Sequence, residues 1–254
     1  MDFHKYQGNG NDFVLIDNRS GQIDIRPEVI HKLCDRRFGI GSDGLVLIQD
    51  DAESDFEMVF YNPDASQSFC GNGSRCAVHF AHGLGLIKEE TYFRTTDGLH
   101  RGWVKGDQVR ISIADVPEVV EYPDCYFANT GSPHAVLIVE DVDSIDVASE
   151  GRRLRMDPRF APGGCNVNFV QLTQEGIKSR VFERGVEGET LSSGSGTTAQ
   201  AICAHFKEPG IGEHITVQTR GGELEVEFKA ENGSFGQIYL SGPICHVFSG
   251  QLTL

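Results

Sequence analysis

The sequence predicts an α+β protein made of two similar domains, and three observations support this fold class. Short motifs from the first half of the 254-residue chain recur in the second half in the same order. Short apolar runs typical of strands outnumber the stretches that can form helices. Each half also contains a glycine-rich turn that opens an apolar helix. Two repeats that are rich in strands and contain a few helices are typical of the α+β class.

Five pairs of segments carry the internal repeat, and they occur at a nearly constant offset. Any single match could arise by chance, whereas five in the same order indicate a duplicated domain. The pairs are Gly10-Asn11-Asp12-Phe13-Val14 with Gly131-Ser132-Pro133-His134-Ala135, Asp35-x-Arg37-Phe38 with Asp157-x-Arg159-Phe160, Val59-Phe60 with Val181-Phe182, Cys70-Gly71-Asn72-Gly73 with Ser193-Gly194-Ser195-Gly196, and Phe93-Arg94-Thr95 with Val217-Gln218-Thr219.

The elements of the first half follow from its apolar pattern and its turn residues. An apolar run over 13–16 predicts an early strand. A helix is expected to begin near Arg26-Pro27-Glu28, where proline suits the first turn, and to stop at Gly39. Strands are expected over 45–48 and 56–61, followed by a helix over 73–82 behind the glycine-rich turn. A pair of alternating strands, 92–104 and 108–113, closes the half.

The second half has the same plan with a weaker first helix, expected over 149–155. Strands are expected over 168–172 and 179–182, and a second helix over 196–206. Alternating strands over 215–228 and 236–240 close this half. A duplicated domain creates a cleft between similar halves, which suits a substrate that is approached from two sides.

Composition excludes several kinds of partner. A net charge of −15 repels phosphate backbones and anionic lipid, so we expect neither nucleic acid nor membrane as a partner. No stretch approaches the roughly 20 apolar residues of a membrane span. The first residues lack the apolar run of a signal peptide, and the seven cysteines show no close pairing. We therefore expect free thiols and a cytoplasmic location. The cysteines and nine histidines show no zinc spacing, so we expect no metal.

The segment Phe69-Cys70-Gly71-Asn72-Gly73 places a cysteine at the start of a buried helix. Free backbone N–H groups and the positive end of the helix dipole favour a thiolate there, and they can also hold a carboxylate. A lone cysteine is more often a small buried hydrophobe. The matching loop Ser193-Gly194-Ser195-Gly196 in the other half is what favours a functional site.

Several motifs resemble those of the diaminopimelate epimerase family. They are Asn11-Asp12-Phe13 after Gly-x-Gly, Asn62-x-Asp64 before Cys70-Gly71-Asn72-Gly73-x-Arg75-Cys76, Glu183-Arg184-Gly185 before Glu189-Thr190, and the tail Gly242-Pro243-x-x-His246-Val247-Phe248-x-Gly250. The resemblance runs in register from Asp2 to Leu254. It implies two domains, 1–116 and 117–242, each a strongly curved sheet around a central helix, with residues 243–254 pairing with the first domain.

The resemblance also implies a cofactor-free isomerase that converts LL-diaminopimelate to the meso form in lysine and cell-wall synthesis. In such a two-base mechanism, one cysteine thiolate removes the α-proton and a second cysteine thiol protonates the opposite face. Cys70 matches the first cysteine, and the substrate is expected between Cys70 and Ser193. A homodimer is implied as well. The expected substrate-binding residues are Asn11, Asn62, Asn166, Glu183 and Arg184, with Arg184 on the distal carboxylate, and Gly71, Asn72, Gly194 and Ser195 on the α-carboxylate.

One departure from the family pattern affects the chemistry, because Ser193 stands where the second cysteine belongs. A helix terminus can bring the pKa of a thiol towards neutrality, whereas an aliphatic hydroxyl starts far less acidic. Serine becomes a working base only when another base takes its proton. His134 and His205 are candidates for that base, although neither has a spacing that predicts contact. We therefore expect impaired inversion.

The serine is compatible with a deliberate disarming substitution, with a natural enzyme that epimerises slowly, and with a changed function. The alternative functions are a non-catalytic diamino-acid-binding protein, and a proline-, hydroxyproline- or histidine-type racemase or dehydratase that uses Cys70 as its sole thiol base. Arg184 argues against small proline-like substrates, because these have no distal carboxylate for it to bind. Gly44 and Ser132 stand where some family members carry glutamine and asparagine, which leaves the exact substrate open.

Overall fold

The computed structural model divides into two units, each of which we describe by itself. It describes residues 1–21, 23 and 25–253, so that Gln22, Asp24 and Leu254, the last residue of the expected C-terminal segment, lie outside the described residues. Unit 1 comprises Met1–Ile111 and Gly242–Leu254, and unit 2 comprises Ser112–Ser241. The expected domain limits, after residues 116 and 242, lie five residues and one residue further along the chain than these unit limits, and they stay a prediction.

Unit 1 is a mixed sheet against which two helices pack, α1 and α2. In spatial order its strands are β17, β1, β2, β3, β4, β5, β6 and β7, and only the β2–β3 and β4–β5 pairs are parallel. The elements are β1 (Asp2–Gly8), β2 (Asn11–Asp17), α1 (Pro27–Cys34), β3 (Gly44–Gln49), β4 (Phe56–Tyr61), α2 (Gly71–Gly83), β5 (Glu90–Thr95), β6 (Gly98–Lys105), β7 (Gln108–Ile113) and β17 (Cys245–Gln251).

Unit 2 repeats this plan. Its strands follow the order β8, β9, β10, β11, β12, β14, β15 and β16, with parallel pairs at β10–β11 and β12–β14 and with β13 added beside β12. The elements are β8 (Val120–Glu121), β9 (Tyr126–Asn129), β10 (Pro133–Ile138), η1 (Val142–Ser144), α3 (Val147–Arg155), η2 (Pro158–Phe160), β11 (Asn166–Thr173), β12 (Gly176–Glu183), β13 (Gly188–Thr190), α4 (Gly194–Lys207), η3 (Pro209–Ile211), β14 (His214–Thr219), β15 (Gly222–Glu231) and β16 (Ser234–Pro243).

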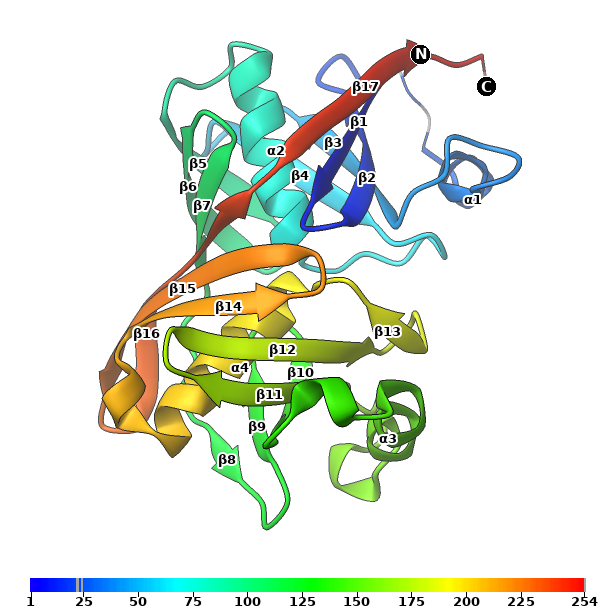
Figure 1. Ribbon diagram of the computed structural model, residues 1–254. Coiled ribbons are helices and arrows are strands. Elements are labelled where there is room, and N and C mark those ends of the chain that lie inside the picture. Colours follow the sequence, from blue (N-terminus) through cyan, green and yellow to red (C-terminus); the bar gives the residue numbers. More distant parts are fainter. Residues whose placement is uncertain (22, 24, 254) are drawn as a thin grey trace. The chain divides into compact units, whose positions relative to one another are not determined.

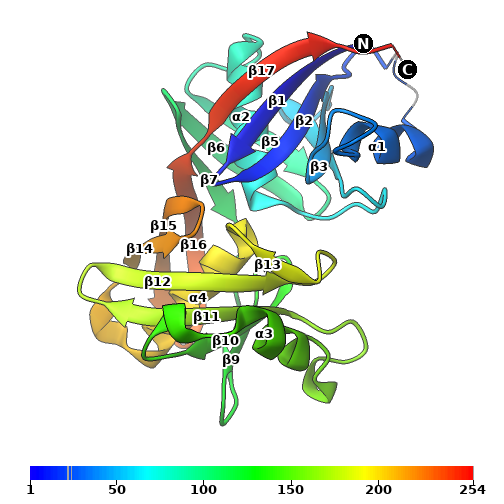
Figure 2. The same cartoon turned by 45° about the vertical axis from the view of Figure 1, so that its right-hand side comes forward.

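Each sheet curves around one buried helix (Figures 1 and 2). In unit 1, α2 contacts strands β1, β2, β3, β4 and β6, and in unit 2, α4 contacts β9 to β12, β14 and β15. Both helices are apolar and small on most sides, with buried residues such as Ala77, Val78, Ala201 and Ile202. A helix that is buried all round needs such small, apolar side chains to let strands approach from several directions. The predicted α+β class, with a curved sheet around a central helix in each repeat, is confirmed.

The first helix is shorter than expected, because α1 ends at Cys34 and does not reach Gly39. Asp35 leaves the helical conformation, and its Oδ1 accepts the backbone N–H groups of Arg37 and Phe38 at 2.7 and 2.8 Å. Aspartate side chains often compete with a helix in this way by capping a turn of their own. Gly39 packs against the last helical turn, where a Cβ atom would lie 1.6 Å from the Lys32 carbonyl oxygen.

Two further corrections concern strands. The expected strand 92–104 is a hairpin of β5 and β6 with its turn at Thr96-Asp97. Gly98, which follows the turn, has a φ of 136° that disfavours other residues. Strand β1 was not predicted, because its residues look polar in sequence. The structure buries Lys5 and Tyr6 between β2 and β17, to which β1 pairs on both sides.

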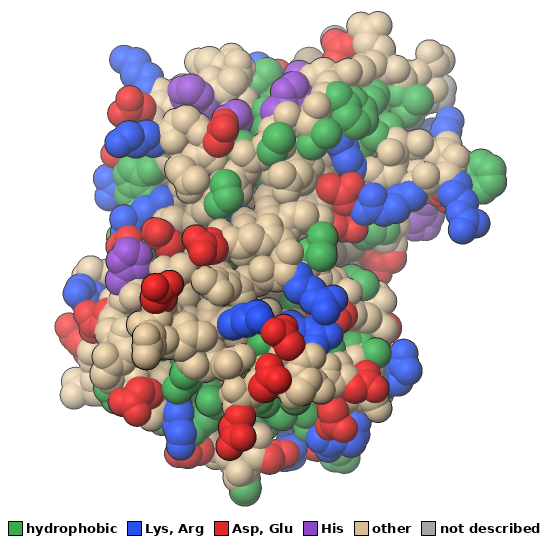
Figure 3. All heavy atoms as spheres, in the orientation of Figure 1, with side chains coloured by type: hydrophobic (Ala, Val, Ile, Leu, Met, Phe, Trp, Pro, Cys, Tyr) green, Lys and Arg blue, Asp and Glu red, His purple; other side chains and the backbone are tan. Residues whose placement is uncertain are grey.

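The charged side chains on the surface and the hydropathy of the helices both agree with the composition of the chain. Figure 3 shows acidic and basic side chains interspersed over the face in view, with the acidic residues prominent, as 37 Asp and Glu against 22 Lys and Arg require. Within the described part of the chain, no helix is long and apolar enough to cross a membrane.

Candidate functional site

Cys70 caps the N-terminus of α2. Its backbone is extended, and its Sγ accepts the N–H of Gly73 at 3.4 Å. The Cys70 carbonyl accepts the N–H of Ser74 and closes the first helical turn at 2.8 Å. Gly71 and Asn72 are buried directly behind the cap. The first N–H groups of the helix and the positive end of its dipole are therefore directed at the Cys70 thiol, an arrangement that favours a thiolate or binds an anion.

The other cysteines differ from Cys70 in their exposure. Cys70 is partly exposed and Cys245 is exposed, whereas the remaining five are buried. Burial raises the pKa of Cys76 to about 12, so this neighbour on α2 remains a neutral thiol. Among the residues that the structure describes, no group of three or more metal-ligating side chains is present.

Behind the Cys70 cap lies a polar layer that contains Arg75. The Arg75 Nη2 donates to Asn72 Oδ1 at 2.7 Å and to Asn9 Oδ1 at 2.9 Å, and its Nη1 donates to the Pro243 carbonyl at 3.1 Å. Asn72 donates in turn to Asn11 Oδ1 at 3.3 Å. The orientation of both carboxamides is therefore set by hydrogen bonds that begin at the buried guanidinium.

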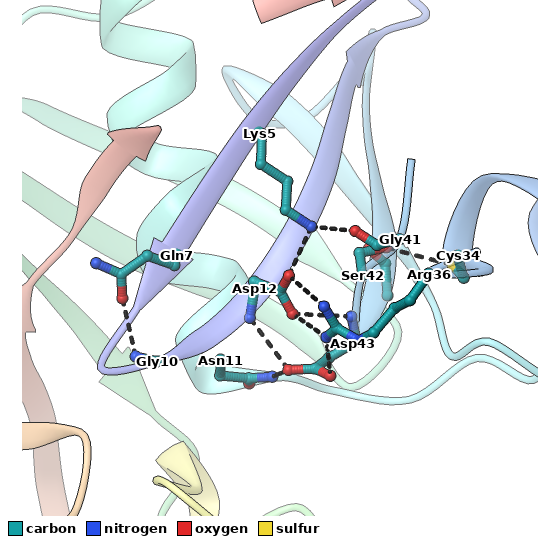
Figure 4. A network of polar contacts seen from close by, with 11 residues as sticks. Lys5, Gln7, Gly10, Asn11, Asp12, Cys34, Arg36, Gly41, Ser42 and Asp43 are labelled. Atoms are coloured by element: carbon teal, nitrogen blue, oxygen red, sulfur yellow. Dashed lines mark hydrogen bonds and ion pairs between the residues drawn. The ribbon is translucent and has the colours of Figure 1, made fainter. Parts of the chain in front are cut away.

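A second network holds the other side of Asn11 (Figure 4). Asn11 Nδ2 donates to Asp43 Oδ2 at 2.8 Å, and Arg36 bridges Asp43 and Asp12. The buried Lys5 pairs with Asp12 at 2.6 Å. Burial raises the pKa of Asp12, but hydrogen bonds from Arg36 and Lys5 outweigh it and lower this pKa to about 2. Asp12 is thus a carboxylate at neutral pH, and the cluster holds Asn11 from the side opposite Asn72.

Asn62 follows β4 and lies in a polar turn of its own. Its Nδ2 donates to the Ser66 carbonyl at 3.3 Å and to the Ser66 and Ser68 hydroxyls at 3.1 and 3.2 Å. Asp64 Oδ1 accepts the backbone N–H of Ser66 and stabilises the same turn. These contacts fix the amide nitrogen of Asn62 within unit 1.

In unit 2, Ser193 caps α4 in the way that Cys70 caps α2. Its Oγ accepts the N–H of Gly196 at 3.4 Å, and its carbonyl accepts the N–H of Thr197 at 2.7 Å. Ser193 and Gly194 are buried and Ser195 is partly exposed. Among the described residues, the Ser193 hydroxyl has no partner that could act as its base.

His134, one of the two histidines considered as a base for Ser193, contacts a different serine. Its Nε2 lies 3.0 Å from Ser195 Oγ, and its Nδ1 lies 3.2 Å from the amide nitrogen of Asn168. Because Nδ1 accepts from that amide, the ring proton is assigned to Nε2, which donates to Ser195. Complete burial lowers the pKa of His134 to about 3, and the charge of Arg184 acts in the same direction. His134 is therefore a neutral hydrogen-bond donor.

His205, the other candidate, bonds the Gly212 carbonyl through Nδ1 at 2.8 Å. The layer behind the α4 terminus is completed by neutral side chains. Gln200 donates to Asn168 Oδ1 at 2.9 Å, and Asn168 donates to the Ala135 carbonyl. Thr198, which the repeat aligns with Arg75, donates to the Gly194 carbonyl. No charged group enters this layer among the described residues.

The remaining expected residues of unit 2 meet at the start of β11 and the end of β12. Asn166 Oδ1 accepts the backbone N–H of Arg184 at 2.9 Å, and its Nδ2 donates to the Pro133 carbonyl. The Arg184 guanidinium is exposed and has no hydrogen-bond or ion-pair partner within the described chain. Thr190 donates to Glu183 Oε1 at 2.5 Å. An unpaired planar guanidinium is suited to bind a carboxylate in two-point fashion.

The glycine at position 44, where some family members carry glutamine, has a steric explanation. A Cβ atom there would lie 2.3 Å from Cε2 of Phe60 and 2.8 Å from the Tyr61 carbonyl oxygen. The Phe60 ring thus occupies the space that a side chain at position 44 would need. For Ser132 the structure offers no comparable reason.

Sequence reasoning did not identify Arg75, His134 or Asp43 in the roles they have here. Arg75 and Asp43 stood in quoted motifs or next to them, but nothing in the local spacing indicates which side chains they bond. Their partners lie up to 168 positions away, as with Arg75 and Pro243. The sequence feature that could have indicated a special role for Arg75 is the repeat, because it aligns Arg75 with the neutral Thr198.

Comparisons with known proteins show which family the chain belongs to. The model of the family described as "Diaminopimelate epimerase" matches residues 3–113 and 126–247. A diaminopimelate epimerase from Flavobacterium psychrophilum is 45% identical over 255 residues, which cover 98% of each chain. Two solved structures share the fold at low identity. A phenazine biosynthesis protein from Bacillus anthracis superposes with a TM-score of 0.80 at 12% identity, covering 100% of this chain and 99% of its own. A probable proline racemase from Agrobacterium radiobacter superposes with a TM-score of 0.73 at 14% identity, covering 100% and 93%.

Proposed function

This chain belongs to the diaminopimelate epimerase family of isomerases, and from that premise we propose that it converts LL-diaminopimelate to the meso form. The observation that carries the proposal is the equivalence of Cys70 and Ser193. Each residue is the N-cap of the buried helix of its unit, and each side chain accepts the N–H three residues later at 3.4 Å. Inversion at carbon needs one group to remove a proton and another to deliver one to the opposite face, and this pair offers two matched positions.

We assign proton removal to Cys70. Its thiolate takes the α-proton, and the electron pair of the broken C–H bond passes into the α-carboxylate as an enolate-like dianion. Backbone N–H groups at the start of α2, behind Gly71 and Asn72, and at the start of α4, behind Gly194 and Ser195, stabilise this charge. Return of a proton to the opposite face of the carbon completes the inversion. The chemistry needs no redox cofactor, because no electrons leave the substrate.

Ser193 makes the delivery step slow. Its hydroxyl is a much weaker acid than a thiol, and it has no base partner among the described residues, because His134 bonds Ser195. A proton delivered through Ser193, or through water beside it, therefore faces a higher barrier than one delivered by a thiol. We expect exchange of the α-proton with solvent at the face of the α-carbon that Cys70 reaches. We also expect slow formation of the second stereoisomer.

Arg184 and Glu183 supply recognition of the distal end of the substrate. The exposed guanidinium of Arg184 has no partner in the described chain, while the Asn166 side chain fixes its backbone. Diaminopimelate carries a second carboxylate that such a guanidinium can bind, and a second amine that the Glu183 carboxylate can bind. Asn11 and Asn62 are assigned to polar contacts in unit 1.

The experiment compares this protein with its Ser193→Cys variant. Each is incubated with LL- and meso-diaminopimelate in heavy water, and α-deuterium uptake and the ratio of isomers are followed. We expect exchange with little inversion for the serine protein, and an inversion rate about 100-fold higher or more for the variant. Neither exchange nor inversion by Ser193→Cys would reject diaminopimelate as the substrate.

A second candidate is a diamino-acid-binding protein without turnover, which the unassisted Ser193 hydroxyl favours. The same experiment separates it from the enzyme. Binding of diaminopimelate by calorimetry, with no deuterium uptake by the serine protein, is the outcome that it requires.

We also propose that the enzyme acts as a cytoplasmic homodimer in lysine and cell-wall synthesis. Val247 and Phe248 of β17 are 51% and 47% exposed, and Figure 3 shows hydrophobic side chains gathered over this strand. Apolar side chains left on a surface often mark a protein contact. Light scattering should give twice the chain mass of 27.9 kDa, and a monomer at micromolar concentration would contradict the dimer.

A further inference from the structure

Arg75 is a buried cation that has no counter-ion among the residues the structure describes. Its side chain is 0% exposed, and no carboxylate lies within ion-pair distance in the described chain. Within the described chain its guanidinium bonds neutral acceptors alone, two asparagine side chains and the Pro243 carbonyl. Its Nε has no hydrogen-bond partner among the described residues. A Cβ on Gly8 would lie 3.2 Å from Nη2, so the β1 backbone closes over the group.

This arrangement is costly for folding. An isolated charge loses its hydration on burial, and neutral acceptors recover only part of that loss. The position adds a further cost, because a cation near a helix N-terminus opposes the helix dipole. Burial lowers the pKa of Arg75 to about 10, while the neighbouring Cys76 and Cys70 act to raise it. The guanidinium therefore remains charged at neutral pH in spite of its surroundings.

Cys70 is the neighbour that can make use of this charge. Cys76 is completely buried and stays a thiol, whereas Cys70 is partly exposed at the helix cap. The other charged groups near Asn11 compensate one another, since Lys5 and Arg36 pair with Asp12 and Asp43. His79, further along α2, is near Asp107 and has a pKa lowered mainly by burial. Among the described residues, Arg75 is thus the positive charge behind the α2 terminus that no carboxylate compensates.

We propose that Arg75 is a positioning residue that keeps Cys70 as a thiolate and fixes Asn72 and Asn11 for substrate. Both effects come from one guanidinium, whose charge interacts electrostatically with the Cys70 thiol and whose Nη2 sets the Asn72 carboxamide. The role rests on the proposed function of Cys70 as the base. It has no counterpart in unit 2, where Thr198 stands in its place and His134 is neutral.

The first test needs no variant and no substrate. The protein is treated with iodoacetamide at pH values from roughly 5 to 9, and alkylation of Cys70 and Cys245 is measured by peptide mass spectrometry. Only the thiolate displaces iodide, so each rate profile reports the ionisation of its own thiol. We expect the midpoint of Cys70 to lie about one pH unit or more below that of the exposed Cys245. Equal midpoints would overturn the proposal.

The second test compares two variants, Arg75→Met and Arg75→Lys. Methionine keeps the apolar bulk and removes the charge, whereas lysine keeps the charge and loses the planar fork. We expect Arg75→Met to raise the Cys70 midpoint by about one pH unit and Arg75→Lys to raise it by less than half of that. A purely structural role would leave the midpoint unchanged in every variant that folds, and this result would also overturn the proposal.

If Arg75→Met does not fold, Ser193→Cys provides the comparison instead. The thiol introduced at position 193 caps an equivalent helix without a buried cation, although the exposed Arg184 lies on the same unit. We expect Cys70 to ionise at a lower pH than this introduced thiol, and the reverse order would contradict the role of Arg75. A low Cys70 midpoint without deuterium uptake from diaminopimelate would reject the proposed substrate and leave the role of Arg75 standing.

Discussion

The two helix starts that carry Cys70 and Ser193 share a backbone and differ in the layer behind them. The caps have φ and ψ of −135° and 105° at Cys70, and −134° and 120° at Ser193. Behind Cys70 lies a buried arginine, and behind Ser193 lies a neutral set that includes His134 and Thr198. Duplication thus preserved the geometry of the caps, while substitutions in the second layer changed the electrostatic potential that each cap experiences.

A second pair of equivalent positions shows the same divergence. Gly44 and Asn166 each begin the strand that runs parallel to the early strand of its unit. In unit 1 the Phe60 ring fills the place of a side chain, whereas in unit 2 the Asn166 amide holds the Arg184 backbone. Unit 2 therefore carries an amide side chain that unit 1 cannot accommodate at the equivalent position.

The largest expected effect tests the difference between the two caps directly. Cys70→Ala should lower α-deuterium uptake from diaminopimelate by about 100-fold or more, because it removes the proposed base. Ser193→Ala should leave this uptake essentially unchanged, because the Ser193 hydroxyl has no base partner among the described residues. The two variants are matched, since each removes one helix cap at a similar cost in stability.

Uptake is measured by mass spectrometry of the recovered substrate, with circular dichroism to verify folding. If Ser193→Ala lost as much exchange as Cys70→Ala, the hydroxyl would be an active base and the asymmetry between the caps would be wrong.

A smaller effect concerns acid stability, which both layers lose as the pH falls, but in different pH windows. The pKa of His134 is about 3 in the folded protein and 6.5 when unperturbed. The unfolded chain therefore binds the extra proton first, and stability falls as the pH decreases below 6.5. At pH 5 the loss from this group is about 2 kcal/mol relative to neutral pH.

Asp12 in unit 1 affects the free energy of unfolding at lower pH than His134 does. Its pKa is about 2 against 3.8 unperturbed, so its contribution is present above pH 3.8 and is lost towards pH 2. Urea unfolding at pH 7 and pH 5 should show a smaller difference for His134→Gln than for the unaltered protein. Asp12→Asn is the control and should leave the difference between these two pH values intact. An unaltered pH dependence in His134→Gln would contradict the neutral, buried state of His134.

The smallest expected effect comes from the surface cluster of unit 1. Arg36 and Asp43 have side chains that are 57% and 44% exposed, so solvent screens their pairing. Asp43→Asn should lower the free energy of unfolding by less than about 1 kcal/mol. Urea unfolding at low and high salt checks this value, and a larger loss would mean that the cluster supports the Asn11 layer more strongly than we infer.

Much of the fold could be predicted from sequence because its signals are local or repeated. The apolar runs that became β2 and β3 are continuous and that of β4 is interrupted by Glu57 alone, and the repeat indicated the same order of elements in unit 2. The predicted end of α1 was wrong, because the Asp35 side chain captured two backbone N–H groups that sequence periodicity does not reveal. Strand β1 was missed because its burial depends on β17, which lies at the opposite end of the chain.

The sequence by itself determined the α+β class, the duplication and the two caps, Cys70 and Ser193. These depend on backbone patterns within a few residues, such as glycines that open a helix. The tertiary structure alone decided what lies behind each cap. Arg75 bonds Asn9 and Pro243, and His134 bonds Ser195, across 66, 168 and 61 positions. The electrostatic potential at a thiol or hydroxyl is set by such distant neighbours and by their burial. Sequence spacing carries no information about which residues are neighbours or how deeply they are buried.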